Sequence, residues 1–266
     1  MNNLISLTAV DLLLAALLVV ALSGMAARLK LGLSMQLIIA AMRTTAQLLI
    51  VGVILKTVFS EARLSWIVLI VLVMISVASW EILARQKRKL RGIWAFSVSA
   101  LALFVSSFLI TVVALVLIIK VDPWYTPQYA IPLLGMLLGN TMNGIALGMD
   151  RLIQTAWQQR FVIEQRLMLG QESDDAIREI RHDSMRAGMI PIINAMAAAG
   201  IVSLPGMMTG QILAGSPPIE AVKYQILIMF LVTAGTGFGV VLVLHLISNR
   251  LFDNRQRLRF ERLLKV

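Results

Sequence analysis

Residues 93–119 read IWAFSVSALALFVSSFLITVVALVLII and contain no charged side chain. About 20 apolar residues suffice for a helix to cross the ~30 Å hydrocarbon layer of a membrane. The whole chain is 59% hydrophobic, whereas soluble domains hold about 45–50% apolar residues. Lipid cannot satisfy an open backbone, so each span must be a helix. We therefore predict an all-α fold, a polytopic integral membrane protein.

Seven apolar spans are predicted, separated by charged or turn residues. The first is expected to be retained rather than cleaved as a signal peptide, because Met1 to Val10 contain no basic residue. Errors of a few residues are normal for such boundaries. The predicted spans are Ile5–Ala27, Leu33–Val58, Leu64–Leu83, Ile93–Ile119, Tyr129–Met149, Ile190–Leu213 and Tyr224–Ser248.

The basic residues are distributed unevenly between the two sides of the predicted membrane. With the N-terminus outside, 19 of the 24 Lys and Arg residues fall on the inner side and four on the outer side, and Arg43 lies within a span. Cytoplasmic loops are enriched in Lys and Arg. We therefore place the loop 150–189 and a basic tail, 249–266, in the cytoplasm. The net charge of +10 then reflects topology, and no nucleic-acid partner is expected. With no cysteine, disulfides and thiolate metal sites are excluded.

The loop 150–189 is long and charged, and helical periodicity indicates that it is folded. We expect the fifth span to continue into a helix over 151–169, which Gly170 ends. A second helix is predicted to begin near Ser173 and run through Arg186, with Asp174 and Asp175 favourable at its N-terminus. Two interpretations stay open: a hairpin lying on lipid headgroups, or a docking surface for a soluble partner. Six Arg against seven acidic residues between Asp150 and Arg186 favour docking.

Glu164 to Gly170 resembles the E-A-A-x-x-x-G coupling loop of ABC importer permeases, in which a short helix inserts into a groove on the ATPase subunit. Gln165 and Arg166 stand where that motif has its two alanines. The match is therefore confined to the outer positions of the motif.

A resemblance over nearly the whole chain rests on several segments in the same order and spacing. These segments are RTTAQLLIVG (43–52), PLLGMLLGNTM (132–142), DSMR (183–186) with Pro191, SLPGMMTG (203–210) and KYQ (223–225). Together they resemble the FetB (YbbM-like) family of ABC transporter permeases, related to the plant aluminium-sensitivity permeases. The resemblance implies iron export from the cytoplasm and resistance to oxidative stress.

The resemblance also implies partners and coupling residues. Residues 1–266 would form a single transmembrane permease domain in the inner (plasma) membrane, with a FetA-like ABC ATPase as a separate subunit. Two permease chains and two ATPase subunits are expected, with ATP and magnesium bound by the ATPase. This chain itself contains no G-x-x-x-x-G-K-[ST] motif, and we expect no catalytic residue in it. The coupling-loop candidates are Glu164, Arg166, Gly170, Asp183 and Arg186.

Placing a polar side chain within a membrane span costs free energy, so such residues are candidates for the translocation path. Arg43 is predicted about 15 Å into the second span, with Gln47 on the same helical face and Asp11 as its counter-charge. The alternative is an ion pair that only locks helices together. Glu81 is either an inner-gate carboxylate or a solvated interfacial residue.

The fifth span adds Asn140, Met142 and Asn143 to the path candidates. Neighbouring glycines there allow close helix packing, which amides then reinforce. Methionine is a soft metal ligand but also an ordinary core residue. Only two histidines occur, and neither forms a paired ligand motif on a span. The metal ligands therefore stay undetermined from the sequence.

Three alternatives to an iron-exporting ABC permease remain. The first is an ABC permease for another cargo, such as a nucleotide sugar or a lipid. The second is a secondary transporter that uses Asp11, Arg43 and Glu81 as a proton relay. The third is a membrane enzyme or scaffold, although no cluster of acidic, His and Ser residues has a characteristic catalytic spacing.

Overall fold

A computed structural model describes residues 7–61, 63–90 and 92–263. The described residues form helices and turns, with isolated bridges in place of strands. The all-α, polytopic prediction is confirmed. Several residues used in the sequence predictions lie outside the described part, namely residues 1–6, which include the start of the first span, Arg91, and residues 264–266 of the basic tail.

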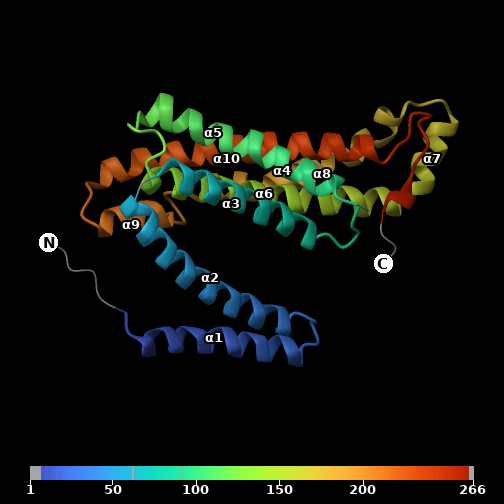
Figure 1. Ribbon diagram of the computed structural model, residues 1–266. Helices are drawn as coiled ribbons and strands as arrows, with labels where there is room; N and C mark the ends of the chain where they lie inside the picture. Colours follow the sequence, from blue (N-terminus) through green and yellow to red (C-terminus); the bar gives the residue numbers. More distant parts are fainter. Residues whose placement is uncertain (1–6, 62, 91, 264–266) are drawn as a thin grey trace. The chain divides into compact units, whose positions relative to one another are not determined.

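The chain divides into two compact units, which are described separately. The first comprises Met1–Arg63 with Leu213–Gly215, and the second comprises Leu64–Ile212 with Ser216–Val266. The first unit contains a pair of helices, α1 (Ala9–Arg28) and α2 (Ser34–Glu61) (Figure 1). They are joined through a turn in which Gly32 has a φ of 70°, and the Ser23 hydroxyl donates to the Ser34 carbonyl oxygen at 3.0 Å.

The second unit contains the remaining helices. A continuous helical stretch follows α3 and alternates α-helical and π-helical turns through α4, η1, α5 and η2. The bounds are α3 (Leu64–Ala84), α4 (Trp94–Leu103), η1 (Phe104–Phe108), α5 (Leu109–Val113), η2 (Ala114–Ile119), α6 (Pro127–Gln158), α7 (Arg160–Met168), α8 (Ser173–Ala198), α9 (Gly206–Leu213, whose last residue belongs to the first unit), α10 (Pro218–Arg250) and the 3₁₀ turn η3 (Phe260–Arg262).

Six helical stretches in the described part of the chain are long and apolar enough to cross a membrane. They correspond to six of the seven predicted spans. The prediction of Ile190–Leu213 as one helix was wrong. Its first part belongs to α8, which begins far earlier and continues through Pro191, and its last part is the short α9. Between them, Gly200 adopts a φ of 85°, which a regular helix does not tolerate.

Glycines on α6 show how α6 and α10 are oriented. A Cβ added to Gly144 would lie 2.7 Å from the Thr236 side chain, and one added to Gly148 would lie 2.9 Å from Leu244. Both partners advance in the same direction, so α6 and α10 run parallel. The chain must therefore return between them.

The return path is α8, which lies between α6 and α10 in sequence and packs against both (Figure 1). A Cβ on Gly144 would approach the Gly188 carbonyl oxygen to 2.9 Å, and one on Gly148 would approach that of Ser184 to 3.0 Å. These partners run in opposite order, so α8 is antiparallel to α6. Small residues let the backbones approach closely, as is usual between helices in membranes.

Candidate functional site

The predicted cytoplasmic loop forms a helical hairpin, which we call the α7–α8 hairpin and define as residues 160–186. Helix α6 continues from the fifth span to Gln158, as predicted. The prediction of one helix over 151–169 was wrong, because the chain bends at Gln159 before α7 begins. Gly170 ends α7 with a φ of 90°, and its N–H donates to the Leu167 carbonyl oxygen at 3.0 Å. The prediction that Gly170 terminates this helix is confirmed, as is a second helix starting at Ser173.

The tip of the α7–α8 hairpin is apolar and exposed. Met168 and Leu169, the last residue of α7 and its C-cap, are 87% and 86% exposed. Removing apolar surface from water is favourable by about 25 cal/mol per Å². The tip is therefore suited to burial in a partner.

Arg166 holds the two arms of the hairpin together near the tip. Its guanidinium donates to the Ala176 carbonyl oxygen at 3.3 Å and to the Glu179 carboxylate at 2.8 Å. The hydrogen bond from Arg166 lowers the pKa of Glu179 below its usual value. Arg166, predicted as a coupling residue, thus lies in the hairpin as a brace between α7 and α8.

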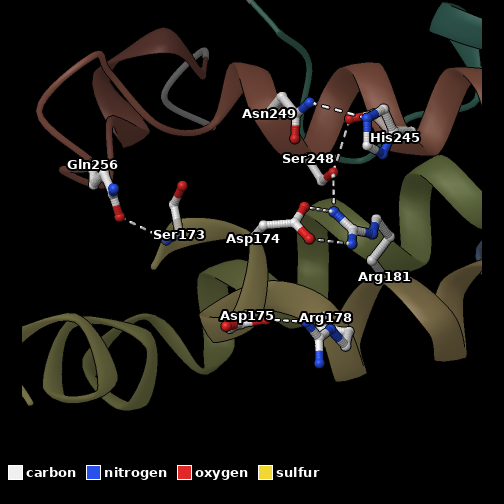
Figure 2. Close-up of polar contacts among 9 residues, drawn as sticks. All are labelled: Ser173, Asp174, Asp175, Arg178, Arg181, His245, Ser248, Asn249 and Gln256. Atoms are coloured by element: carbon white, nitrogen blue, oxygen red, sulfur yellow. Dashed lines mark hydrogen bonds and ion pairs between the residues drawn. The ribbon is translucent and has the colours of Figure 1, made fainter. Parts of the chain in front are cut away.

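A second brace connects the start of α8 to the end of α10 (Figure 2). The buried guanidinium of Arg181 donates to both carboxylate oxygens of Asp174 and, at 3.4 Å, to the Ser248 hydroxyl. The hydrogen bond from Arg181 lowers the pKa of Asp174 below its usual value. Bidentate Arg–carboxylate pairs fix orientation as well as charge. Asp174 therefore orients the Arg181 guanidinium within α8, and the hydrogen bond from Arg181 to Ser248 is the contact with α10.

The described part of the C-terminal tail, 251–263, folds back rather than extending away. The backbone N–H of Ser173 donates to the Gln256 side-chain oxygen at 2.9 Å, as Figure 2 shows. A tight turn in the tail is centred on Asp253, whose carboxylate accepts from the backbone N–H groups of Arg255 and Arg257, each at 2.9 Å. These bonds, led by that of Arg257, lower the pKa of Asp253 to about 2.

Trp157, near the end of α6, is the centre of an aromatic and cationic cluster. The Arg88 guanidinium lies 4.2 Å from its ring centroid and that of Arg160 lies 5.0 Å away. Phe260 of the tail meets the Trp157 ring edge-on at 5.1 Å. The cluster connects the α3–α4 turn, α6, α7 and the tail at the point where the hairpin begins.

Polar groups also link the end of α3 to α6. The Gln86 amide donates to the Ala146 carbonyl oxygen at 3.1 Å, and the Lys87 N–H donates to Asp150 at 3.1 Å. Arg85 donates to the Asn143 side-chain oxygen and lies 3.9 Å from the Glu81 carboxylate. Two predicted path residues, Glu81 and Asn143, are therefore connected through Arg85, near the hairpin end of the helices.

The other predicted path residues of this unit lie apart from that link. Asn140 is exposed and donates to the Met136 carbonyl oxygen of its own helix at 2.8 Å. Met142 packs against the main apolar core. Within the described residues, no three His, Asp or Glu side chains are grouped in a way that could hold a metal ion.

The remaining path candidates belong to the first unit. Asp11 lies in the first turn of α1, where its carboxylate accepts from the Thr8 N–H at 2.8 Å and from the Thr8 hydroxyl at 2.7 Å. This is a capping box, which gives Asp11 a structural role at the helix start. Arg43 and Gln47 lie on α2, four residues apart and hence on one face. Their part in a translocation path stays a prediction.

The other predicted coupling residues are exposed on the hairpin. Glu164 lies on α7, and Asp183 and Arg186 lie on α8. Sequence reasoning missed Arg181, Ser248 and the tail contacts. The i, i+7 spacing of Asp174 and Arg181 places them two turns apart on one helical face. Nothing in the sequence, however, indicates that Ser248 of α10 contacts Arg181.

Comparison with known proteins gives the family. The model of UPF0014, described as an uncharacterised protein family, matches residues 9–252. The chain belongs to the UPF0014 family. This family match includes the hairpin, the broken α8–α9 region and all six apolar stretches.

Several UPF0014 relatives align over most of their length. The UPF0014 membrane protein slr1647 of Synechocystis is 41% identical over 86% of this chain and 87% of its own. The probable iron export permease protein FetB of Escherichia coli is 32% identical over 95% of both chains. The protein ALUMINUM SENSITIVE 3 of Arabidopsis thaliana is 33% identical over 75% of this chain and 71% of its own. The resemblance predicted from the sequence is confirmed.

No solved structure matches the chain. The UPF0014 assignment and the apolar helices together establish a multi-pass membrane protein of a family that includes a named permease.

Proposed function

We propose that this chain is the membrane-spanning permease subunit of an ATP-driven ABC transporter, and that a separate ATPase docks on the α7–α8 hairpin. The observation that carries the proposal is the exposed apolar pair Met168 and Leu169 at the hairpin tip. Burying apolar surface in a partner is favourable by about 25 cal/mol per Å². The Arg166–Glu179 and Arg181–Asp174 ion pairs stabilise the hairpin next to this tip. Movement of a docked ATPase would therefore be transmitted to the membrane helices.

The braces define the mechanical connection. Arg166 links α7 to α8 through Glu179, and Arg181, oriented by Asp174, links α8 to α10 through Ser248. Helix α8 then continues between α6 and α10 into the apolar region. Movement of a docked ATPase would therefore displace α8 relative to α6 and α10. Glu164, Asp183 and Arg186 are exposed on the same hairpin and would contact the ATPase surface.

The proposed cargo is iron, or a related metal, moved out of the cytoplasm. The proposal is supported by 32% identity over 95% of both chains with the Escherichia coli protein named a probable iron export permease. Export of iron would also protect the cell against oxidative stress. In this assembly, a FetA-like ATPase holds ATP and magnesium, and two permease chains pair with two ATPase subunits.

The proposed setting is the inner (plasma) membrane, with the N-terminus outside and the C-terminus in the cytoplasm. The uneven distribution of Lys and Arg supports this orientation, since the predicted topology puts 19 on the inner side and four on the outer side. The hairpin is then accessible to a cytoplasmic ATPase. A cysteine added after residue 266 and labelled only in inside-out vesicles would support this topology, and labelling in intact cells would contradict it.

Co-purification in mild detergent tests docking. We expect a stoichiometric P-loop ATPase with the tagged wild-type chain and at least about tenfold less with Leu169→Glu. The substitution places a charge at an apolar side chain that the docked ATPase would bury. Gln165→Glu is the matched control, since it adds the same charge at an exposed site on α7. Equal recovery of the ATPase with both variants would contradict docking at the tip.

Transport tests the cargo. Inside-out vesicles containing the permease and its ATPase should accumulate ferrous iron when ATP is added, and Leu169→Glu should abolish that accumulation. Accumulation driven by a proton gradient without ATP would instead identify a secondary transporter. ATP-driven transport that excludes iron would place the chain among ABC permeases for another cargo.

A further inference from the structure

The chain between α8 and α9 leaves the helical conformation within an otherwise apolar region. Helix α8 ends at Ala198 and α9 begins at Gly206. In the intervening turn, the Gly200 N–H donates to the Ser203 carbonyl oxygen at 2.9 Å. We call residues 199–205 the broken segment.

The depth of the broken segment follows from a contact between α8 and α10. The Thr233 hydroxyl lies 3.3 Å from the Met196 sulfur, and Thr233 is near the middle of the 33-residue helix α10. Ala198 is two residues beyond Met196, or about 3 Å at ~1.5 Å per residue. About 10 Å of the predicted span of α10, which begins at Tyr224, extends past that level. Helix α8 therefore stops well inside the layer that α10 crosses.

The start of α9 gives the same depth independently. Met207, in the first turn of α9, packs against a buried apolar cluster that contains Leu133, Ile228 and Val232. Leu133 lies within α6, and the other two lie within α10. Both ends of the broken segment are thus next to membrane-spanning parts of these helices.

Non-helical backbone at this depth cannot face lipid. The carbonyl oxygens of Ile201, Val202 and Leu204 accept no backbone hydrogen bond from any residue that the structure describes. Each unsatisfied group in hydrocarbon costs several kcal/mol, so such backbone must contact protein or line a water-filled cavity. Ile201 and Val202 are 91% and 82% exposed, so the described chain does not cover their side chains. Water or a second copy of the chain must therefore satisfy the carbonyl oxygens.

We propose that the broken segment lines a water-filled part of the transport pathway, open to the side of the membrane opposite the α7–α8 hairpin, and that this part selects cations. The last carbonyl groups of α8 carry the partial negative charge of a helix C-terminus. The turn adds the unpaired carbonyl oxygens of Ile201, Val202 and Leu204, which suit hard cations. Its place in a transport pathway rests on the function proposed above, whereas its contact with water requires no ATPase.

Cysteine labelling tests the proposal directly, because the chain contains no native cysteine. Ile201→Cys and Val202→Cys would each be treated in intact cells with a membrane-impermeant maleimide. A cysteine at Phe230 is the matched control, because Phe230 is exposed on α10 at nearly the same depth. Ser203→Cys, a nearly isosteric change, is the variant to use if the others fold poorly.

We expect the cysteines of the broken segment to react at least about tenfold faster than the one at Phe230, since a thiol in an apolar setting is rarely ionised. Reaction no faster than at Phe230 would overturn the proposal. So would rapid disulfide formation between two Ile201→Cys chains without labelling, because the segment would then be covered by a second copy. Labelling only in inside-out vesicles would overturn the proposed side of opening.

Charge selectivity is measured on the same variants. A trimethylammonium thiosulfonate should react at least about threefold faster than a sulfonate thiosulfonate, after correction for their rates with a free thiol, because local potential concentrates the cation. Equal or reversed rates would overturn the cation preference. Repeating the labelling in cells without the ATPase separates this outcome from the function proposed above, since accessibility must persist there.

Discussion

Gly144 of α6 and Gly188 of α8 face each other without room for a side chain between them. A Cβ at Gly144 would lie 2.9 Å from the Gly188 carbonyl oxygen, and a Cβ at Gly188 would lie 2.7 Å from that of Gly144. Because both obstacles are backbone atoms, no side-chain rotation can relieve the clash. The spacing of α6 and α8, and so the position of the hairpin, depends on this contact.

We predict that Gly144→Ala and Gly188→Ala each destabilise the protein. Overpacking costs about 1–3 kcal/mol, which outweighs the roughly 1 kcal/mol that alanine contributes to helix propensity. Gly139→Ala is the matched control on α6, since a Cβ there would meet nothing within 4 Å. Melting of the detergent-solubilised protein should show a lower Tm for the first two variants only. A Tm for Gly139→Ala as low as theirs would contradict the contact-based explanation.

We predict that removing the Asp174 carboxylate destabilises the protein more than removing that of its neighbour Asp175. Asp174→Ala leaves the Arg181 guanidinium, whose side chain is 8% exposed, without its carboxylate partner. The expected cost is about 1–3 kcal/mol, together with weaker ATPase binding. Asp175→Ala removes an exposed pair with Arg178 and should cost at most about 1 kcal/mol. Parallel unfolding measurements and ATPase pull-downs check this; equal losses would show that the Asp174–Arg181 pair stabilises the protein no more than an exposed ion pair does.

Asp253 predicts a pH dependence in the tail. Its pKa is lowered from 3.8 to about 2 in the folded protein, so its stabilising effect is fully present above about pH 4. That effect should disappear as the pH falls from about 4 to about 2. The difference in Tm between wild type and Asp253→Asn should therefore be largest above about pH 4 and vanish only below about pH 2. A difference that is constant over this range would contradict the assigned role of the carboxylate.

Phe260 predicts how firmly the tail is held. Phe260→Ala removes the edge-on contact with Trp157, worth about 0.5–1.5 kcal/mol beyond simple burial. Trypsin should then cleave the tail several-fold faster, near Arg255 and Arg257. Asn254→Ala is the control, since Asn254 is exposed within the same segment. Unchanged cleavage of Phe260→Ala would mean that other contacts hold the tail.

Much of the hairpin could be predicted because its signals are local. Gly170 ends α7 where the periodicity stopped, and Ser173 begins α8 where acidic residues favour a helix N-terminus. The predicted span over 190–213 failed because hydropathy averages over a window, so the positive φ of Gly200 left no trace in it. Pro191 is the second residue of the predicted span 190–213, but it lies well within α8, where packing against α6 and α10 stabilises the helix.

The sequence by itself determined the class of the protein, because the free energy of placing apolar residues in lipid depends on composition and length alone. It also determined the family, whose segments occur in order along the chain. Only the tertiary structure decided which residues meet. The pairing of Arg181 with Ser248, the stacking of Arg88 on Trp157, and the depth of the broken segment arise from helices distant in sequence. Their physical reason is close packing of α6, α8 and α10, which sets the register between helices and which no single helix specifies.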